Sequence, residues 1–193
     1  MCSRFELNTA PDELARRFGF EFMAVPNQSE FRPTDLALVI TAEGPRMMGW
    51  GLSVDWDSKP IINARAEMLR TKKTFRPFLE TRCIVPATAY FEWRKDGAAR
   101  HKNRIHLEGG TLFAFAGLTN GERFTIITCP PAAAIATIHN RMPVILEQQA
   151  EGQWINSETS FEAVSGGLIP YREKTIAAQE DAPPPILQAD LFD

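Results

Sequence analysis

Ile-Val-Pro-Ala-Thr-Ala-Tyr-Phe-Glu-Trp, residues 84–93, is the stretch of this sequence that decides its fold. β-branched and aromatic residues dominate it, which is typical of β-strands. Similar runs, bounded by Pro, Gly or Asn, stand at 36–40, 111–118 and 124–128. Gly109-Gly110 and Asn120-Gly121 are typical turn sequences between such runs. Strands are therefore predicted to dominate the middle of the chain.

Short helices are predicted around these strands. Residues 9–12 combine an N-cap threonine, a proline and an aspartate, and the apolar residues after them recur at helical spacing up to Gly19. Residues 131–138 and 147–155 are predicted to form two further short helices. The expected fold class is α+β: a mainly antiparallel sheet or barrel with short peripheral helices.

Composition indicates one folded domain. The chain has 193 residues, of which 44% are hydrophobic and 23% charged, so it can bury a core. We find no internal repeat or linker, and expect a single domain over 1–182 followed by an extended tail over 183–193, which begins with three prolines. Nothing in the sequence predicts an oligomer, so we expect a monomer.

No apolar run approaches the roughly 20 residues that a membrane helix needs, so no membrane association is expected. The first residues, Met-Cys-Ser-Arg-Phe-Glu, lack the pattern of a secretory signal, which favours a cytoplasmic protein. The three cysteines, Cys2, Cys83 and Cys129, are widely spaced and odd in number. They predict neither a disulfide framework nor a metal site, and we expect no cofactor.

Charge is distributed unevenly, although the net formal charge is only -3. Residues 65–104 hold 11 basic and 4 acidic side chains, whereas the segments before and after them are both acidic. Arginine, whose planar fork suits phosphate, accounts for 15 of the 21 basic residues. The basic middle segment could therefore line a groove for a polyanion, or it could pair with the acidic segments as an ordinary solvated face.

Cys2 is the most unusual position. A small second residue normally allows removal of the initiator methionine, which would leave cysteine at the amino terminus. Its α-amino group, with a reference pKa of about 7.7 to 8.0, would be partly neutral at pH 7 and would attack aldehydes. The neighbouring thiol could then close the imine to a five-membered thiazolidine. The alternative is that Cys2 is merely a small buried side chain.

Three other residues could take part in proton transfer or binding. Glu92 stands among aromatic residues, where a carboxyl group acquires a raised pKa and can act as a general acid or base. His139 titrates near neutrality and lies two residues from Arg141, and Asn63 stands close to Arg65 and Glu67. Each also has an ordinary interpretation: a solvated strand carboxylate, a loop histidine and a turn former.

Taken together, these segments resemble the SRAP family, the SOS response-associated peptidases that act as abasic-site processing proteins. The resemblance rests on ordered blocks, of which one departs from the usual family pattern by having Ser3 in place of glycine. The blocks are Met1 to Phe5, Trp50 to Leu52, Ile62 to Glu67, Phe75 to Pro77, Arg82 to Ala87, Phe91 to Trp93 and His139 to Val144.

The resemblance implies a β-rich fold with a basic cleft for single-stranded DNA that carries an abasic site. By position it makes Cys2 the crosslinking nucleophile, Asn63 a ligand of the sugar, Glu92 the general acid/base and His139 an assistant in proton transfer. It assigns phosphate contacts to Arg4, Arg65, Arg76 and Arg141, and base stacking to Trp50. From its position between two glycines alone, Trp50 could equally be a core residue. Autoproteolytic removal of Met1 and a DNA lyase side activity also follow from the same chemistry.

Two other functions stay open at this point. The chain could be a cysteine peptidase with an N-terminal nucleophile, in which Cys2, Glu92 and His139 act on peptides. It could also be a module that binds single-stranded DNA without covalent chemistry. Separately, Gln188, Leu191 and Phe192 in the tail resemble the short bacterial peptide that binds the replication sliding clamp, although Ala189 departs from its consensus. The alternative is that the tail docks on the protein's own core.

Overall fold

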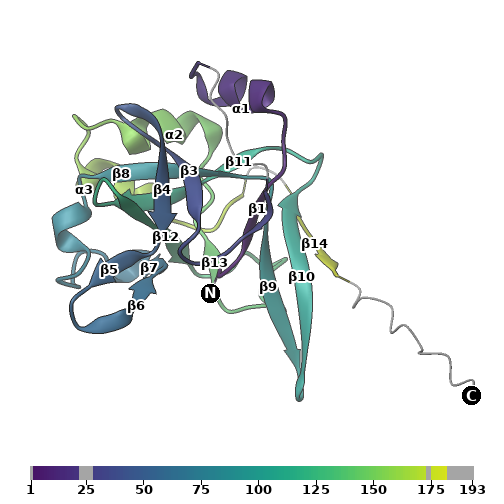
Figure 1. Ribbon diagram of the computed structural model, residues 1–193. Helices are drawn as coiled ribbons and strands as arrows, with labels where there is room; N and C mark the ends of the chain where they lie inside the picture. Colours follow the sequence, from purple (N-terminus) through teal and green to yellow (C-terminus); the bar gives the residue numbers. More distant parts are fainter. Residues whose placement is uncertain (1, 22–27, 173–174, 182–193) are drawn as a thin grey trace, which may run out of the picture.

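The computed structural model describes residues 2–21, 28–172 and 175–181, arranged as two main sheets with a few helices at their margins (Figure 1). One sheet has the strand order β14-β10-β9-β1-β2. Its members are β1 (Phe5–Leu7), β2 (Gln28–Phe31), β9 (Ala89–Asp96), β10 (Ala99–Leu107) and β14 (Ile176–Glu180). All of its pairings are antiparallel.

The second sheet closes into a barrel. Its strands follow the order β11-β8-β3-β4-β12-β13, and β11 also pairs with β12, which joins the two sides. The members are β3 (Leu36–Thr41), β4 (Gly44–Trp50), β7 (Asn63–Arg65), β8 (Arg82–Ala87), β11 (Phe113–Thr119), β12 (Arg123–Cys129) and β13 (Met142–Pro143). β4 and the short strand β7 run parallel to β12, whereas the other pairings are antiparallel. The predicted α+β class with a mainly antiparallel, barrel-like sheet is confirmed.

The stretch 84–93 is divided between the two sheets. β8 belongs to the barrel and β9 to the other sheet, and Thr88 separates them. Thr88 donates its backbone N–H to the carbonyl of Glu6 at 2.8 Å, which holds the bend against β1. The strand predicted here is therefore two strands, and it links the two sheets of the molecule.

The other strand predictions are confirmed as β3, β11 and β12. The turn at Asn120 is also confirmed: its Oδ1 accepts hydrogen bonds from the backbone N–H groups of Glu122 and Arg123, and Gly121 has a φ of 93°. Gly109 and Gly110, both with positive φ, connect β10 of one sheet to β11 of the other.

Two of the three predicted helices are present. α1 (Pro11–Phe18) ends at Gly19, which has a left-handed φ of 70°, but its N-cap is Ala10 and Thr9 bonds to the Glu13 carboxylate instead. α2 (Gln148–Ile155) buries Trp154. The helix predicted at 131–138 is wrong, because that segment forms isolated turns in which the i to i−4 bonds do not continue.

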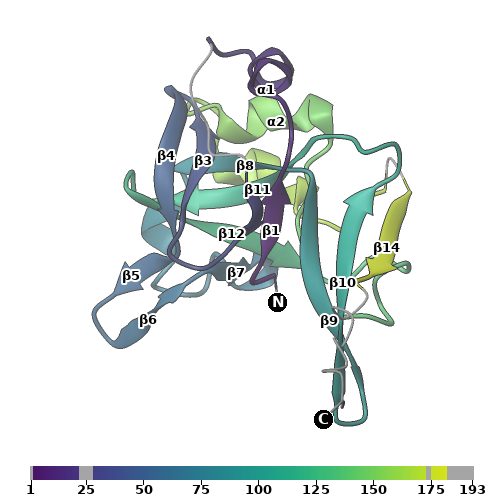
Figure 2. The ribbon, with the colours of Figure 1, turned by 45° about the vertical axis from the view of Figure 1, so that its right-hand side comes forward.

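The remaining elements are short. They are the two-stranded hairpin of β5 (Leu52–Val54) and β6 (Asp57–Ile61), the helix α3 (Phe161–Val164), and 3₁₀ turns at Ala66–Met68, Arg76–Phe78 and Ser165–Gly167. Figure 2 shows β5 and β6 extending from one side of the barrel and the β9–β10 hairpin extending from the other. No helix among the described residues is long and apolar enough to cross a membrane.

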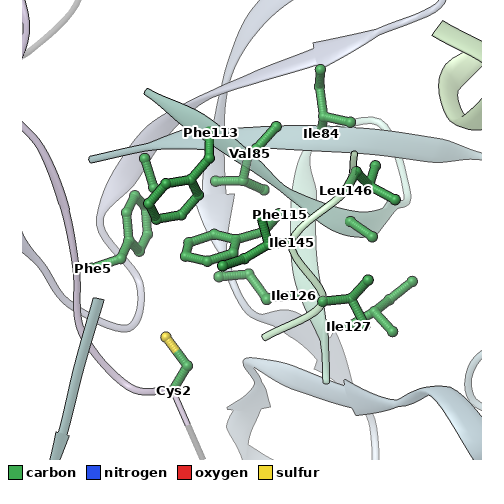
Figure 3. Close-up of a cluster of buried hydrophobic side chains, with 14 of the residues drawn as sticks. Cys2, Phe5, Ile84, Val85, Phe113, Phe115, Ile126, Ile127, Ile145 and Leu146 are labelled. Carbon is green, nitrogen blue, oxygen red and sulfur yellow. The ribbon is translucent and has the colours of Figure 1, made fainter. Parts of the chain in front are cut away.

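Aromatic side chains fill the space between the sheets. Phe5 stacks on Phe31 at 4.7 Å between ring centroids and meets Phe115 edge-on at 6.1 Å. Cys2 lies below these rings with its sulfur directed at the cluster (Figure 3). Burial of such rings is the main source of stability in a domain of this size, and it also fixes the amino-terminal segment against the core.

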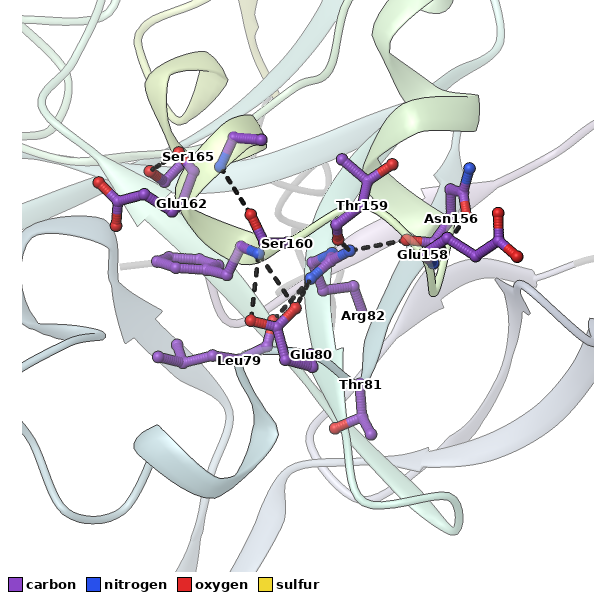
Figure 4. Close-up of polar contacts among 12 residues, drawn as sticks. Leu79, Glu80, Thr81, Arg82, Asn156, Glu158, Thr159, Ser160, Glu162 and Ser165 are labelled. Carbon is purple, nitrogen blue, oxygen red and sulfur yellow. Dashed lines mark hydrogen bonds and ion pairs between the residues drawn. The ribbon is translucent and has the colours of Figure 1, made fainter.

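Arg82 ties the helical margin to the barrel (Figure 4). Its side chain is 1% exposed and donates to the carbonyls of Leu79, Trp154, Asn156 and Thr159 and to the carboxylate of Glu80. A buried guanidinium needs this many acceptors to offset its desolvation. One arginine of the basic segment is therefore structural.

Candidate active site

The backbone of Arg4, two residues after Cys2, holds the amino-terminal segment against strand β9. The carbonyl of Arg4 accepts a hydrogen bond from the N–H of Phe91 at 3.0 Å and a weaker one from the Cys2 thiol at 3.5 Å. The thiol is fully buried. Burial raises the pKa of the Cys2 thiol, and the charge of Glu92 raises it further. The resting sulfur is therefore a protonated thiol.

Asn63 joins Cys2 from the other side. It is the first residue of β7, whose parallel pairing with β12 places it opposite Ile126. Its Nδ2 donates to the carbonyl of Cys2 at 2.6 Å. Its Oδ1 is buried and has no hydrogen-bond partner among the described residues, so it is an acceptor available to a bound group. Asn63 can hold the nucleophilic residue and a ligand at the same time.

Glu92 is a carboxyl group with 2% of its surface exposed. Burial raises its pKa to about 7, although the positive charge of the chain's amino terminus lowers the pKa in part. A carboxyl group that titrates near 7 can accept and return protons at neutral pH. Its charge acts on the Cys2 thiol, which places it within electrostatic reach of the nucleophile.

His139 lies on the far side of Glu92. Its Nε2 is 3.8 Å from Oε2 of Glu92, and its Nδ1 accepts the N–H of Arg141 at 3.1 Å. Burial lowers the pKa of His139, as does the charge of the amino terminus. The lowered pKa favours a neutral ring at pH 7, in which Nδ1 lies against the backbone of Arg141 and Nε2 faces the Glu92 carboxylate.

The four residues predicted to be catalytic thus come together from four separate segments. Cys2 comes from the amino terminus, Asn63 from β7, Glu92 from β9 and His139 from the loop before β13. Together they offer a nucleophile, an amide, a tunable carboxyl group and a neutral imidazole. This set can add a nucleophile to a carbonyl group and move the protons that the addition requires.

The four arginines predicted to bind phosphate differ in setting. Arg4 donates to Glu30 at 2.9 Å and to the carbonyl of Ser3, and the Arg141 guanidinium binds both oxygens of Glu67 and the carbonyl of Thr128. By contrast, Arg65 and Arg76 are exposed and form no ion pair with another described residue. Arg65 and Arg76 are therefore the arginines of this set that are available to an incoming anion.

The prediction that Trp50 is a stacking platform for a base is wrong. Trp50 is fully buried, donates its Nε1–H to the carbonyl of Ile62 at 2.9 Å, and stacks on Phe124. The stacking role came from the family resemblance, whereas the position between two glycines fitted a core residue equally well. Gly49 and Gly51 allow close packing here, with Gly51 at a φ of 116° against Pro60. Trp50 belongs to the core.

The sequence reasoning missed Trp56, which is 69% exposed. It lies in the turn between β5 and β6 and lines an open cavity of about 430 Å³ with Asn63, Arg65 and Lys72 among its walls. An exposed indole next to two cations is typical of single-strand binding surfaces. Large exposed aromatic residues can only be identified once the fold separates them from the core.

The charged segment 65–104 is partly neutralised by the acidic segments. Arg94 pairs with Glu180, Lys102 with Glu30 and Asp181, and Arg104 with Glu6. Several cations of this segment remain exposed and form no ion pair with another described residue, among them Arg65, Lys72, Lys73 and Arg76. Arg65 and Lys72 line the same cavity as Asn63.

The other sequence predictions concern residues away from this site. Cys83 and Cys129 are buried free thiols. Within the described part of the chain, no group of three or more His, Cys, Asp or Glu side chains could hold a metal ion. Gln188, Leu191 and Phe192 lie outside the described residues.

Comparison with known proteins gives a consistent result. Residues 1–180 match the model of the SOS response associated peptidase (SRAP) family. The chain is 35% identical to the Bacillus subtilis abasic site processing protein YoaM over 89% of this chain and 86% of the relative. It is 33% identical to the Escherichia coli abasic site processing protein YedK over 64% of this chain and 62% of that relative.

A crystal structure of a protein from Bacteroides thetaiotaomicron superposes with a TM-score of 0.81 at 26% identity. The superposition covers 93% of this chain and 91% of that one. The family match covers the described barrel, the second sheet and all four residues of the candidate site. This chain therefore belongs to the SOS response associated peptidase (SRAP) family.

Proposed function

We propose that this protein recognises abasic sites in single-stranded DNA and captures them through a covalent thiazolidine at Cys2. The observation that carries the proposal is the convergence of Cys2, Asn63, Glu92 and His139 around one buried thiol. The relatives named abasic site processing proteins support the substrate, because an abasic site in its open-chain form presents an aldehyde. An aldehyde is the partner that an N-terminal aminothiol selects.

The reaction starts once Met1 has been removed and Cys2 carries the free α-amine. The amine adds to the aldehyde carbon, and loss of water gives an imine. Glu92, with its pKa near 7, supplies the proton that the leaving hydroxyl needs. The thiol sulfur then bonds to the imine carbon, the π electron pair of C=N moves to nitrogen, and the thiol proton ends on that nitrogen.

Reversal uses the same groups in the opposite order. The ring nitrogen is protonated, the C–S bond breaks, and water hydrolyses the imine. His139, neutral and 3.8 Å from Glu92, is placed to pass protons between Glu92 and the adduct. While the imine persists, β-elimination of the 3′ phosphate would give lyase activity. Removal of Met1 by the Cys2 thiol would account for the peptidase chemistry.

We assign the DNA path to the side of the site that carries Asn63. Oδ1 of Asn63 can accept a hydrogen bond from a sugar hydroxyl. Arg65 and Arg76 are available to phosphates, and Trp56 takes the stacking role for a flanking base. Arg4 and Arg141, which bind Glu30 and Glu67, act by positioning the amino-terminal segment and the His139 loop.

Intact-mass measurement with and without an abasic single strand tests the proposal. The wild-type protein should lack Met1 and should gain the mass of the oligonucleotide less one water. Cys2→Ser should give no heat-stable adduct and at most an imine that borohydride reduces. A heat-stable adduct of Cys2→Ser, or equal binding of intact and abasic strands with no adduct of the wild type, would contradict the proposal. A peptidase would cleave peptides without capturing DNA.

The tail supplies a second, separable proposal. Gln188, Leu191 and Phe192 resemble the peptide that binds the bacterial sliding clamp, and tethering to the clamp would concentrate the protein where single strands are exposed. We expect the full chain to bind purified clamp with a Kd in the micromolar range, about 8 kcal/mol. Leu191→Ala with Phe192→Ala should abolish clamp binding and leave DNA capture unchanged. No detectable binding of the wild-type chain would rule out the tether.

A further inference from the structure

Tyr90 carries a buried hydroxyl group that no described residue engages. The residue is completely buried, and its hydroxyl oxygen has no hydrogen-bond partner among the described residues. A phenol hydroxyl that loses water without gaining a partner costs folding free energy. The tyrosine ring would pack against Phe115, which it meets edge-on at 6.0 Å, equally well as a phenylalanine. The hydroxyl therefore calls for an explanation other than packing.

The strand register places Tyr90 beside the segment that carries Cys2. Tyr90 lies opposite Phe5 of β1, and the next residue, Phe91, donates its N–H to the Arg4 carbonyl that also accepts the Cys2 thiol. Because side chains alternate along a strand, Tyr90 and Glu92 project from the face opposite to that of Phe91. They thus occupy neighbouring positions on the face of β9 that borders the nucleophile.

The Cys2 sulfur changes its hydrogen-bonding needs during the proposed reaction. As a thiol it donates to the Arg4 carbonyl. When its proton leaves, the sulfur becomes a hydrogen-bond acceptor. The oxygen of the Arg4 carbonyl then repels the sulfur, because both atoms carry negative charge. Glu92 adds negative charge, and Phe5 and Phe115 are apolar. The sulfur therefore needs a neutral donor at this moment.

Resting on the proposed function, we propose that the Tyr90 hydroxyl is the hydrogen-bond donor that receives the Cys2 sulfur as it loses its proton in ring closure and ring opening. The phenol is suited to this role because it stays protonated. Burial raises the pKa of Tyr90 well above its ordinary value, and negative charge on Cys2, Glu92 or Cys129 raises it further. In this proposal the sulfur exchanges the Arg4 carbonyl for the Tyr90 hydroxyl as its partner.

The step balances without any further reactant. In ring closure the S–C bond forms, the C=N electron pair moves to nitrogen, and the proton from sulfur reaches that nitrogen through Glu92. Tyr90 keeps its proton throughout and only donates a hydrogen bond. In ring opening the C–S bond breaks, and the departing sulfur again accepts the Tyr90 hydrogen bond until it is reprotonated.

Tyr90→Phe tests the inference, since it removes only the oxygen. The processed protein is mixed with an abasic single strand, and two products are followed: the imine trapped by borohydride and the heat-stable thiazolidine. Tyr90→Phe should form the imine at the wild-type rate but close the ring about tenfold more slowly or worse, as expected for losing one hydrogen bond to a charged group. The pH at which ring closure is half-maximal should move upward.

Tyr171→Phe is the matched control, because it removes the other phenol hydroxyl of the chain, which lines a separate cavity with Glu147 and Pro170. It should leave both rates unchanged. The unfolding temperature of Tyr90→Phe should be no lower than that of the wild type, since the oxygen that is removed forms no hydrogen bond with a described residue. The inference would be overturned if Tyr90→Phe closed the ring at the wild-type rate, or if it slowed imine formation as much as ring closure. Absence of any adduct with the wild type would instead refute the proposed function.

Discussion

Burial of the Glu92 carboxyl group raises its pKa, and this makes the stability of the protein depend on pH. The pKa of Glu92 is raised from 4.5 in the unfolded chain to about 7 in the folded protein, so the folded state binds this proton more tightly. Its favourable contribution is complete below pH 4.5 and is lost as the pH rises from 4.5 through 7. Above pH 7 the folded protein retains a buried carboxylate, an unfavourable state that the proposed role of Glu92 in proton transfer would account for.

Glu92→Gln should therefore raise the free energy of unfolding at pH 8 by on the order of 2 kcal/mol and change it little at pH 4.5. Urea unfolding between pH 4.5 and 8 measures the difference. Glu6→Gln is the control of opposite sign: burial alone would raise the pKa of Glu6, but hydrogen bonds from Arg104 and Thr88 lower it. Glu6→Gln should lower the free energy of unfolding, and by most at high pH, where Glu6 is ionised. A Glu92→Gln difference that does not grow with pH would contradict the raised pKa.

Glu92 and His139 should differ in how strongly they affect the formation and the reversal of the proposed crosslink. Glu92→Gln should slow adduct formation by about 100-fold, since an amide cannot exchange the proton. His139→Ala should slow reversal more than formation, because in the proposed mechanism the imidazole, 3.8 Å from Glu92, passes protons to the adduct through Glu92. Reversal is measured by transferring a preformed adduct to an excess of unlabelled abasic strand. Formation at the wild-type rate by Glu92→Gln over pH 6 to 8 would remove Glu92 from the chemistry.

Secondary structure could be predicted from the sequence where an apolar run is long. It could not be predicted where an element forms only through contacts with distant parts of the chain. β3, β11 and β12 carry dense β-branched or aromatic residues and were predictable. β7 has three residues, and only its pairing with β12 makes it a strand. The segment 131–138 has helical composition, but its turns do not propagate, since short helices gain too few bonds to form by themselves.

The candidate site shows the same division. Cys2, Asn63, Glu92 and His139 stand in motifs, so a resemblance could place them together. Trp50 and Trp56 could not be distinguished, because both lie near glycine, proline and charged residues in sequence. The barrel buries the first through β4, while the β5–β6 hairpin carries the second outward. Exposure is a property of the fold and not of the local sequence.

The β5–β6 hairpin should therefore contribute to DNA binding without contributing to stability. Trp56→Ala should weaken single-strand binding by about 1 to 3 kcal/mol, the usual loss for one stacked base, with the unfolding temperature unchanged because the side chain is 69% exposed. Fluorescence anisotropy with a labelled single strand measures the affinity. Trp50→Ala is the contrasting variant and should unfold the protein by creating a core cavity. Unchanged affinity of Trp56→Ala would place the DNA elsewhere.

Across the whole molecule, the basic middle segment serves two purposes that the sequence could not separate. Arg82, Arg94, Lys102 and Arg104 bind backbone carbonyls or the carboxylates of distant segments, so they hold the fold together. The exposed cations near Asn63 are left for an anion. The chain thus uses its acidic segments to neutralise one part of the basic surface, and positive charge gathers where Arg65, Lys72 and Trp56 share a cavity.

This division predicts which arginines change the salt dependence of DNA binding. Each phosphate contact releases counterions, so losing one flattens the slope of log K against log salt by about 0.7 for a single strand. Arg65→Ala and Arg76→Ala should each flatten the slope by that amount. Arg141→Ala should leave the slope unchanged, because its guanidinium binds Glu67 and Thr128, and should instead disturb His139 and slow reversal.

Arg46→Ala, on the β3–β4 hairpin where Arg46 pairs with Glu43, is the control for a change in net charge alone. Titrations of a labelled single strand from 50 to 300 mM salt, about a sixfold range, are enough to resolve one contact. If Arg141→Ala flattened the slope while Arg65→Ala did not, the strand would cross the molecule on the His139 side. The cavity beside Trp56 would then belong to some other ligand, since a backbone that bypasses Arg65 cannot bring a base to that indole.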